Sequence, residues 1–285
     1  MDISKRFRFN DSAASLNLTE VRRVIVFSVL GLCTLASHAA ELRTFTIAQT
    51  EALGRAIFEI ERRTDIAVDL MNEHYDPEQE KIGAWVTEGE PHRLLVRFVR
   101  LTDSGAEPVL DATFEDLLLP SFSVPLRKNL TPFQQSQIAA RQTVQPHLRE
   151  PCSRHFESVA VPDPVTAGLL LYALALEETP TDVMLGGHHR FSLSADGQTM
   201  RQADALSTSC AKTTLAQLQT TDGSQGVAIR ANLSDTPLEI HIYLSLHYRL
   251  PLYVVTRDLK MWEVKDGHMR VIRQRPGEMP SAAIQ

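Results

Sequence analysis

The chain has 285 residues, of which 43% are hydrophobic and 22% charged, a composition that supports a sizeable folded core. Thirteen glycines and fifteen prolines exclude a collagen-like or low-complexity chain, and three cysteines are too few for a disulfide-rich scaffold. The net charge of -6 disfavours contact with nucleic-acid phosphates, so we expect no nucleic acid among the partners.

Residues 1–39 contain the features of a cleavable signal peptide in the usual order. Arg22 and Arg23 precede an apolar run at residues 24–35, and small side chains follow that run. The run is shorter than the roughly 20 residues that a membrane-spanning helix needs, so an uncleaved anchor is the weaker alternative. We expect cleavage after Ala39 and an exported product, periplasmic or secreted, without stable membrane insertion.

Removal of the signal would leave Cys152 and Cys210 as the only cysteines. Two cysteines in an oxidising compartment usually form a disulfide, and we predict this pairing. A thiol nucleophile or a metal ligand is the alternative, favoured by the short spacing between Cys152 and His155. One such pair supplies at most half of a zinc site, so we predict no metal site and no cofactor.

Two helices are predicted in the N-terminal half. Thr46, with a glutamine three residues later, begins a helical spacing of apolar residues that continues to Ile60. Thr131, followed by a proline and then by a glutamine at the third position, predicts a helix over residues 132–144. Both starts have the pattern of a capping box, in which the threonine and the glutamine satisfy free backbone N–H groups.

Short extended runs lie between the two helices. Residues 83–87, 93–101 and 108–114 are separated by glycine-containing turns, which indicates three antiparallel strands. Residues 117–130 contain two prolines and no clear period, and residues 146–164 contain four prolines. We expect both of these stretches to be connectors.

Strand patterns dominate the C-terminal half. Residues 169–176 form an apolar run that favours a strand, and the Asp-Gly pairs at 196–197 and 266–267 are typical of hairpin turns. The clearest alternation is in residues 238–248, where one face is apolar and the other is polar. In such a strand His241 and His247 would lie about 20 Å apart, too far to share a metal ion. The polar row consists of Glu239, His241, Tyr243, Ser245 and His247.

These elements predict an α+β protein, with two helices in the N-terminal half and a predominantly antiparallel meander in the C-terminal half. The signal at 1–39 is followed by an α+β region at 40–145 and a β region at 146–285. The proline-rich stretch either separates two subdomains or interrupts one continuous domain.

The most unusual local sequence is Gly-Gly-His-His-Arg, which ends in His188, His189 and Arg190. In a strand the two histidines point to opposite faces, which makes them a poor chelating pair. A histidine in the core needs partners for its ring nitrogens, so the simplest interpretation is a satisfied core histidine. Contact of His188, His189 or Arg190 with a ligand is the alternative.

Several short motifs follow one another in the C-terminal third. They resemble, in their order, a group of exported proteobacterial proteins without an assigned activity. The resemblance implies export and a shared fold, but it implies no reaction and no functional residue. The motifs are Gly186-Gly187-His188-x-Arg190, Asp196-Gly197, Ser209-Cys210, Ile240-His241, Pro251-Leu252-Tyr253-Val254 and Trp262-Glu263-Val264.

The sequence lacks the Gly-x-Ser-x-Gly, His-Glu-x-x-His, Cys-x-x-Cys, P-loop and dinucleotide motifs, and its one Ser-x-x-Lys match, at Ser209 and Lys212, is expected by chance. We therefore expect an exported non-enzymatic protein that binds or scaffolds through an antiparallel sheet, with His241, Tyr243 and His247 on its polar face. The alternative is a metal- or small-molecule-dependent enzyme that uses His188 and His189. Docking by a sheet edge is a third hypothesis. An envelope protein or a small molecule would be the partner.

Overall fold

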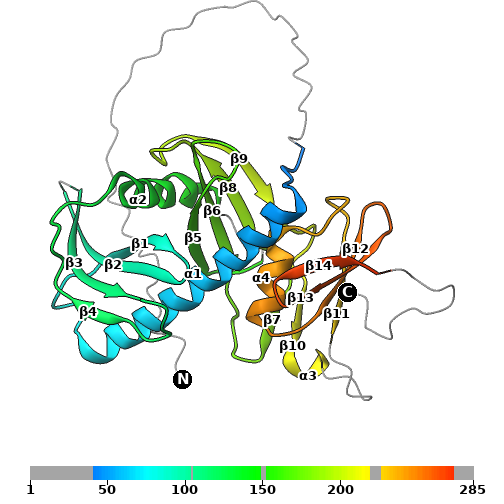
Figure 1. Ribbon diagram of the computed structural model, residues 1–285, viewed down its shortest axis with the longest axis horizontal. Coiled ribbons are helices and arrows are strands. Elements are labelled where there is room, and N and C mark those ends of the chain that lie inside the picture. Colours follow the sequence, from blue (N-terminus) through cyan, green and yellow to red (C-terminus); the bar gives the residue numbers. More distant parts are fainter. Residues whose placement is uncertain (1–40, 104, 149–151, 219–225, 273–285) are drawn as a thin grey trace, which may run out of the picture. The chain divides into compact units, whose positions relative to one another are not determined.

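The computed structural model describes residues 41–103, 105–148, 152–218 and 226–272 (Figure 1). The predicted signal peptide lies outside these ranges. From Leu42 onward the chain forms one compact unit of helices and mostly antiparallel sheets, which confirms the α+β class. Among the described residues, no helix is both long enough and apolar enough to cross a membrane.

Both predicted helices begin where the capping boxes indicate. In α1 (Ile47–His74) the Thr46 hydroxyl accepts a hydrogen bond from the backbone N–H of Gln49, and α2 (Pro132–Val144) begins in the same way at Thr131. The helix α1 has 28 residues and continues well beyond the predicted end, because further apolar residues such as Met71 are buried on it. A short 3₁₀ helix (Gln145–His147) follows α2.

The first sheet confirms the three predicted strands and adds a fourth. Its antiparallel order is β1-β2-β3-β4. The prediction that residues 117–130 form only a connector is wrong at β4, because three of these residues pair with the end of β3. The strands are β1 (Ala84–Glu90), β2 (Arg93–Thr102), β3 (Gly105–Thr113) and β4 (Ser121–Ser123).

The second sheet is also antiparallel, in the order β5-β6-β8-β9. It includes the apolar run predicted as a strand and the hairpin around the first Asp-Gly pair. The strand β5 lies inside the predicted 146–164 connector, since the buried residues Val159 and Val161 pair with β6. The strands are β5 (Phe156–Pro162), β6 (Leu169–Ala175), β8 (His189–Leu193) and β9 (Met200–Ala205).

The remaining strands form a third sheet, in the order β11-β12-β13-β14, and a separate antiparallel pair of β7 and β10. The only parallel pairing among the described strands joins β11 to β12. Asp266 and Gly267 both have positive φ angles in the β13–β14 turn, as the predicted hairpin requires. The strands are β7 (Asp182–Met184), β10 (Lys212–Thr214), β11 (Val227–Ala231), β12 (Leu252–Thr256), β13 (Met261–Lys265) and β14 (His268–Val271).

Residues 238–248 do not form the predicted strand; they contain the helix α4 (Glu239–His247). All of its residues from 239 to 245 are buried, including the supposed polar face. A helix that is covered on every side does not need the 3.6-residue period of an amphipathic helix. The alternation of apolar and polar residues in this segment therefore matched the pattern of a strand. A further short helix, α3 (Leu215–Leu218), also lies in the half that was predicted to be a sheet.

The helix α1 links the three larger sheets. It contacts β2, β5 and β14 and packs along α4 (Figure 1). At Gly54 of α1 a Cβ atom would overlap Ile242 of α4, so the absence of a side chain allows the two helices to cross closely. The helix α2 contacts β1 of the first sheet and β6 and β9 of the second.

Candidate functional site

The Gly-Gly pair before His188 lies against the predicted disulfide, which joins Cys152 and Cys210 with a Cα–Cα distance of 4.9 Å. Gly187 has a φ angle of +85°, and a Cβ atom there would overlap the Cβ atom of Cys152. Its backbone N–H donates to the Ser207 hydroxyl at 2.8 Å. The glycine is therefore required by close approach of the two chain segments that the disulfide joins.

His188 is a core histidine with two hydrogen-bond partners. Its Nδ1 accepts from the backbone N–H of Ala175 at 3.1 Å, and its Nε2 lies 3.2 Å from the carbonyl oxygen of Met184. Burial lowers its pKa to about 4, so the ring is neutral at pH 7. His189 lies on the opposite face of the sheet, as strand parity predicts, with its ring beside Phe156 and Phe191.

Arg190 is the centre of a buried ion cluster and has a fully buried side chain. It donates to Asp204 through Nε and Nη2 at 3.1 and 2.6 Å, and it pairs with Glu239 of α4. The Tyr172 hydroxyl also donates to Glu239, at 3.0 Å. Phe45 covers the guanidinium, with a distance of 4.9 Å from the ring centroid to Cζ. Arg190 thus joins the second sheet, α4 and the segment before α1.

The α4 histidines lie on the same side of the sheet as His188 and Arg190. His241 is buried, and its Nδ1 accepts from the backbone N–H of Leu238 at 2.9 Å. Burial lowers its pKa to about 4. The ring of Tyr243 contacts that of His188 with 6.4 Å between centroids, so the structure brings together residues from both predicted candidate groups.

His247 is held between two carboxylates. Its Nδ1 lies 3.4 Å from Glu61 and its Nε2 lies 3.7 Å from Glu177. Burial disfavours the charged ring, but the two carboxylates outweigh burial and raise its pKa to about 10. Glu177 also accepts a hydrogen bond from Tyr248, and these contacts outweigh its own burial and lower its pKa to about 2. His247 is therefore a protonated partner of an ion pair at pH 7 rather than a base.

Three carboxylates lie close together between α1 and β5. Glu61, Asp65 and Glu157 each offer an oxygen atom, and these atoms lie within 4.8 Å of one another. Among the described residues this is the group whose ligand atoms could surround a divalent cation. The positive charge of His247 beside Glu61 offsets part of the negative charge.

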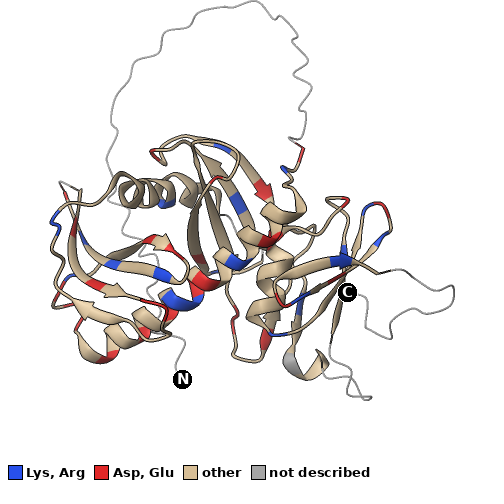
Figure 2. Ribbon diagram, in the orientation of Figure 1, with Lys and Arg blue, Asp and Glu red and all other residues tan. Residues whose placement is uncertain are grey.

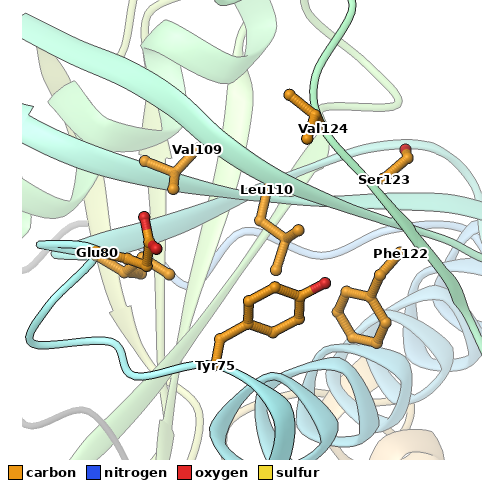
Figure 3. Close-up of a pocket in the computed structure, with 8 residues that line it drawn as sticks. Tyr75, Glu80, Val109, Leu110, Phe122, Ser123 and Val124 are labelled. Atoms are coloured by element: carbon orange, nitrogen blue, oxygen red, sulfur yellow. The ribbon is translucent and has the colours of Figure 1, made fainter.

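A second feature lies at the surface, beside β4. It is a hollow of about 350 Å³, which we call the β4 hollow (Figure 3). The ring centroids of Tyr75 and Phe122 are 5.9 Å apart at one end, and the side chain of Glu80 lies at the other. The hollow is lined by Tyr75, Glu80, Ile82, Val109, Leu110, Phe122, Ser123 and Val124.

Exposed apolar side chains surround β4. The exposed fractions range from 50% at Leu118 to 99% at Leu126, in a stretch where no helix or long strand would bury them. The strand β4 pairs with β3 only, so its other edge has no partner among the described strands. We call the five exposed side chains the apolar connector; they are Leu117, Leu118, Leu119, Val124 and Leu126.

Sequence reasoning selected the histidines and Arg190 but missed their partners and the β4 hollow. The partners Glu61, Glu177 and Asp204 carry no local motif, because they are common surface residues that become buried only in the fold. The apolar connector beside the hollow had one local signal, the Leu-Leu-Leu run at 117–119 inside a segment without a helical or strand period.

No protein-family profile and no curated protein sequence matches the chain. One solved structure is similar in part, the C-terminal domain of YpeB from Bacillus megaterium, with 11% sequence identity and a TM-score of 0.17. The similarity covers 58% of this chain and 67% of that domain. A TM-score this low does not establish a shared fold.

Proposed function

We propose that this protein is an exported, non-enzymatic binding protein that takes up an extended polypeptide segment at the free edge of β4. The observation that carries the proposal is the apolar connector beside an unpaired strand edge. Monomeric proteins rarely expose a contiguous apolar patch without a use for it. In strand addition the edge supplies backbone hydrogen bonds, and neighbouring pockets take alternate side chains.

The local sequence limits such an edge to a short partner. Pro120 precedes β4 and Pro125 follows it two residues later, so only three residues of the chain form the strand. A short edge strand resists open-ended pairing between copies of a protein. The exposed leucines add nothing to that protection. Their exposure therefore favours the interpretation that they form a surface for contact with another chain.

The interior histidines support a structural role rather than catalysis. His188 and His241 are neutral and hydrogen-bonded, and His247 is held in its protonated form by carboxylates. Catalytic bases at neutral pH need a pKa near the working pH and access to a substrate. The proposed site therefore lies at β4, not on the polar row of residues 238–248, which the fold buries.

A labelled peptide tests the proposal. The probe is Thr-Val-Thr-Val-Thr-Val-Thr, and its control is Thr-Val-Pro-Val-Pro-Val-Thr, which cannot donate the same backbone hydrogen bonds. We expect fluorescence polarisation to show binding of the first peptide and at least about tenfold weaker binding of the second, a loss of about 1.4 kcal/mol. Equal binding of the two peptides, or no binding at millimolar concentration, would contradict strand addition.

Protein variants locate the site. Leu118→Glu with Leu126→Glu places charge on two exposed positions of the apolar connector, so folding is unaffected and binding is weakened about tenfold or more. Val165→Glu is the matched control, because Val165 is 62% exposed and lies in the loop between β5 and β6. Unchanged peptide binding by the double variant would place the binding surface elsewhere.

Export to the periplasm or the medium is part of the same proposal. It is supported by the disulfide, which persists in oxidising compartments, and by the signal pattern of residues 1–39. Amino-terminal sequencing of the protein from its own cells should find a start at Ala40. A start at residue 1 together with alkylated Cys152 and Cys210 would contradict export.

A further inference from the structure

We propose that the β4 hollow receives a lysine or arginine side chain of the added peptide. This inference rests on the proposed function and specifies which partner sequence the β4 edge selects. It starts from a chemical asymmetry of the hollow, whose walls are mainly apolar and aromatic and which contains one carboxylate, that of Glu80 (Figure 3).

Glu80 is half-buried, and its carboxylate forms no ion pair with another described residue. Arg100 donates to the backbone carbonyl of Glu80 at 3.0 and 3.3 Å. The guanidinium of Arg100 lies 3.8 Å from the carboxylate of Glu107 instead. Arg100 thus fixes the backbone of Glu80 and leaves the Glu80 carboxylate available for a partner.

The distribution of charged residues near the hollow also favours a basic side chain as its ligand. Acidic residues gather at the end of α1 and in the turn that follows it, and Glu80 of this turn lines the hollow (Figure 2). The sequence there contains Glu73, Asp76, Glu78 and Glu80, against a single lysine, Lys81. A positively charged partner is therefore favoured over a neutral or acidic one.

The shape of the hollow matches a long basic side chain. Lysine and arginine bury an aliphatic stem against apolar surface and keep the charge at its end. The stem would lie along Val109 and Leu110, and the charge would reach Glu80. The rings of Tyr75 and Phe122 lie at the opposite end from Glu80 and add aromatic surface against which the aliphatic stem packs. The edge of β4 would hold the backbone on either side of this side chain.

The test uses three versions of the strand peptide, Thr-Val-Thr-X-Thr-Val-Thr, in which X is Lys, Gln or Glu. For the wild-type protein we expect the Lys peptide to bind about fivefold more tightly than the Gln peptide, and the Glu peptide to bind most weakly. Glu80→Gln should reduce the ratio between the Lys and Gln peptides to about one, because it removes the charge and keeps the shape. The ratio should also fall in 0.5 M salt, which screens a partly exposed pair.

Glu78→Gln is the matched control, because Glu78 is an exposed carboxylate in the same turn, and it should leave the ratio unchanged. Equal affinity for the three peptides, or a ratio that persists in Glu80→Gln, overturns the inference and leaves strand addition standing. Failure of all three peptides to bind overturns both. Equal binding of the Lys peptide and a version with prolines on both sides of X overturns strand addition while retaining the cation site.

Discussion

Arg190 shows how much one residue determines in this fold. Its guanidinium is the positive partner of two buried carboxylates, Asp204 from β9 and Glu239 from α4. Burial of three charges is costly unless each is paired and hydrogen-bonded. The cluster therefore makes the placement of α4 on the second sheet dependent on one side chain.

Arg190→Met should destabilise the protein by about 3–5 kcal/mol, because it leaves two carboxylates buried without a positive partner. Urea unfolding monitored by circular dichroism measures the change. Arg257→Met is the control, since the ion pair of Arg257 with Asp235 is half exposed and should contribute far less to stability. Equal effects of the two substitutions would show that the buried cluster is not a major source of stability.

The sequence isolates Arg190 as unusual, but it does not reveal what the residue binds. Asp204 is 14 positions away and Glu239 is 49 positions away, and neither lies in a recognisable motif. Cys152 and Cys210 could be paired from the sequence, because the predicted loss of residues 1–39 leaves a single pairing. A contact can be predicted from the sequence when each residue has few possible partners. The distance between the two residues along the chain matters less.

At the scale of elements, local signals located most starts and turns. The capping boxes at Thr46 and Thr131 and the turn at residues 266–267 depend on contacts within a few residues, and the structure confirms them. The helix α4 depends on distant contacts. His241 caps its own helix, but Glu239 pairs with Arg190 of β8 and His247 pairs with Glu61 of α1, which the sequence of α4 cannot show.

The strand β4 was missed for a related reason. Three residues between prolines are too short for a recognisable alternation, and they pair only because β3 supplies an edge. The proposed binding surface is therefore built on the least predictable strand of the first sheet. Its one visible signal was the exposed leucines, which a sequence without a structure does not distinguish from a core segment.

At the scale of the whole molecule, three histidines set the pH dependence of stability in opposite directions. His188 and His241 have folded pKa values of about 4, below the usual 6.5, so the stability that they contribute is lost as pH falls from 6.5 towards 4. His247 has a folded pKa of about 10, so its contribution is complete below pH 6.5 and is lost as pH rises towards 10.

Stability should therefore be greatest near pH 6.5 with respect to these groups and fall on both sides, by up to about 3 kcal/mol for each of His188 and His241 and up to about 5 kcal/mol for His247. Urea unfolding at pH 4.5, 6.5 and 9 measures the curve. His247→Gln should flatten the alkaline side, and His241→Gln should reduce the acid-side decline without removing it, because His188 remains. His74→Gln, at an exposed position, should change neither. An alkaline decline that persists in His247→Gln would show that another group is responsible.

The long helix α1 has a consequence for the order in which the molecule is assembled. Near its beginning, Glu51 accepts a hydrogen bond from the backbone of Met269 at 2.9 Å, and Arg55 donates to the carbonyl of Gly267 at 2.7 Å. These two contacts cannot form until the hairpin of β13 and β14 has been synthesised. The beginning of α1 therefore lacks these partners until late in synthesis, and a chaperone bound to the new chain would protect it during that time.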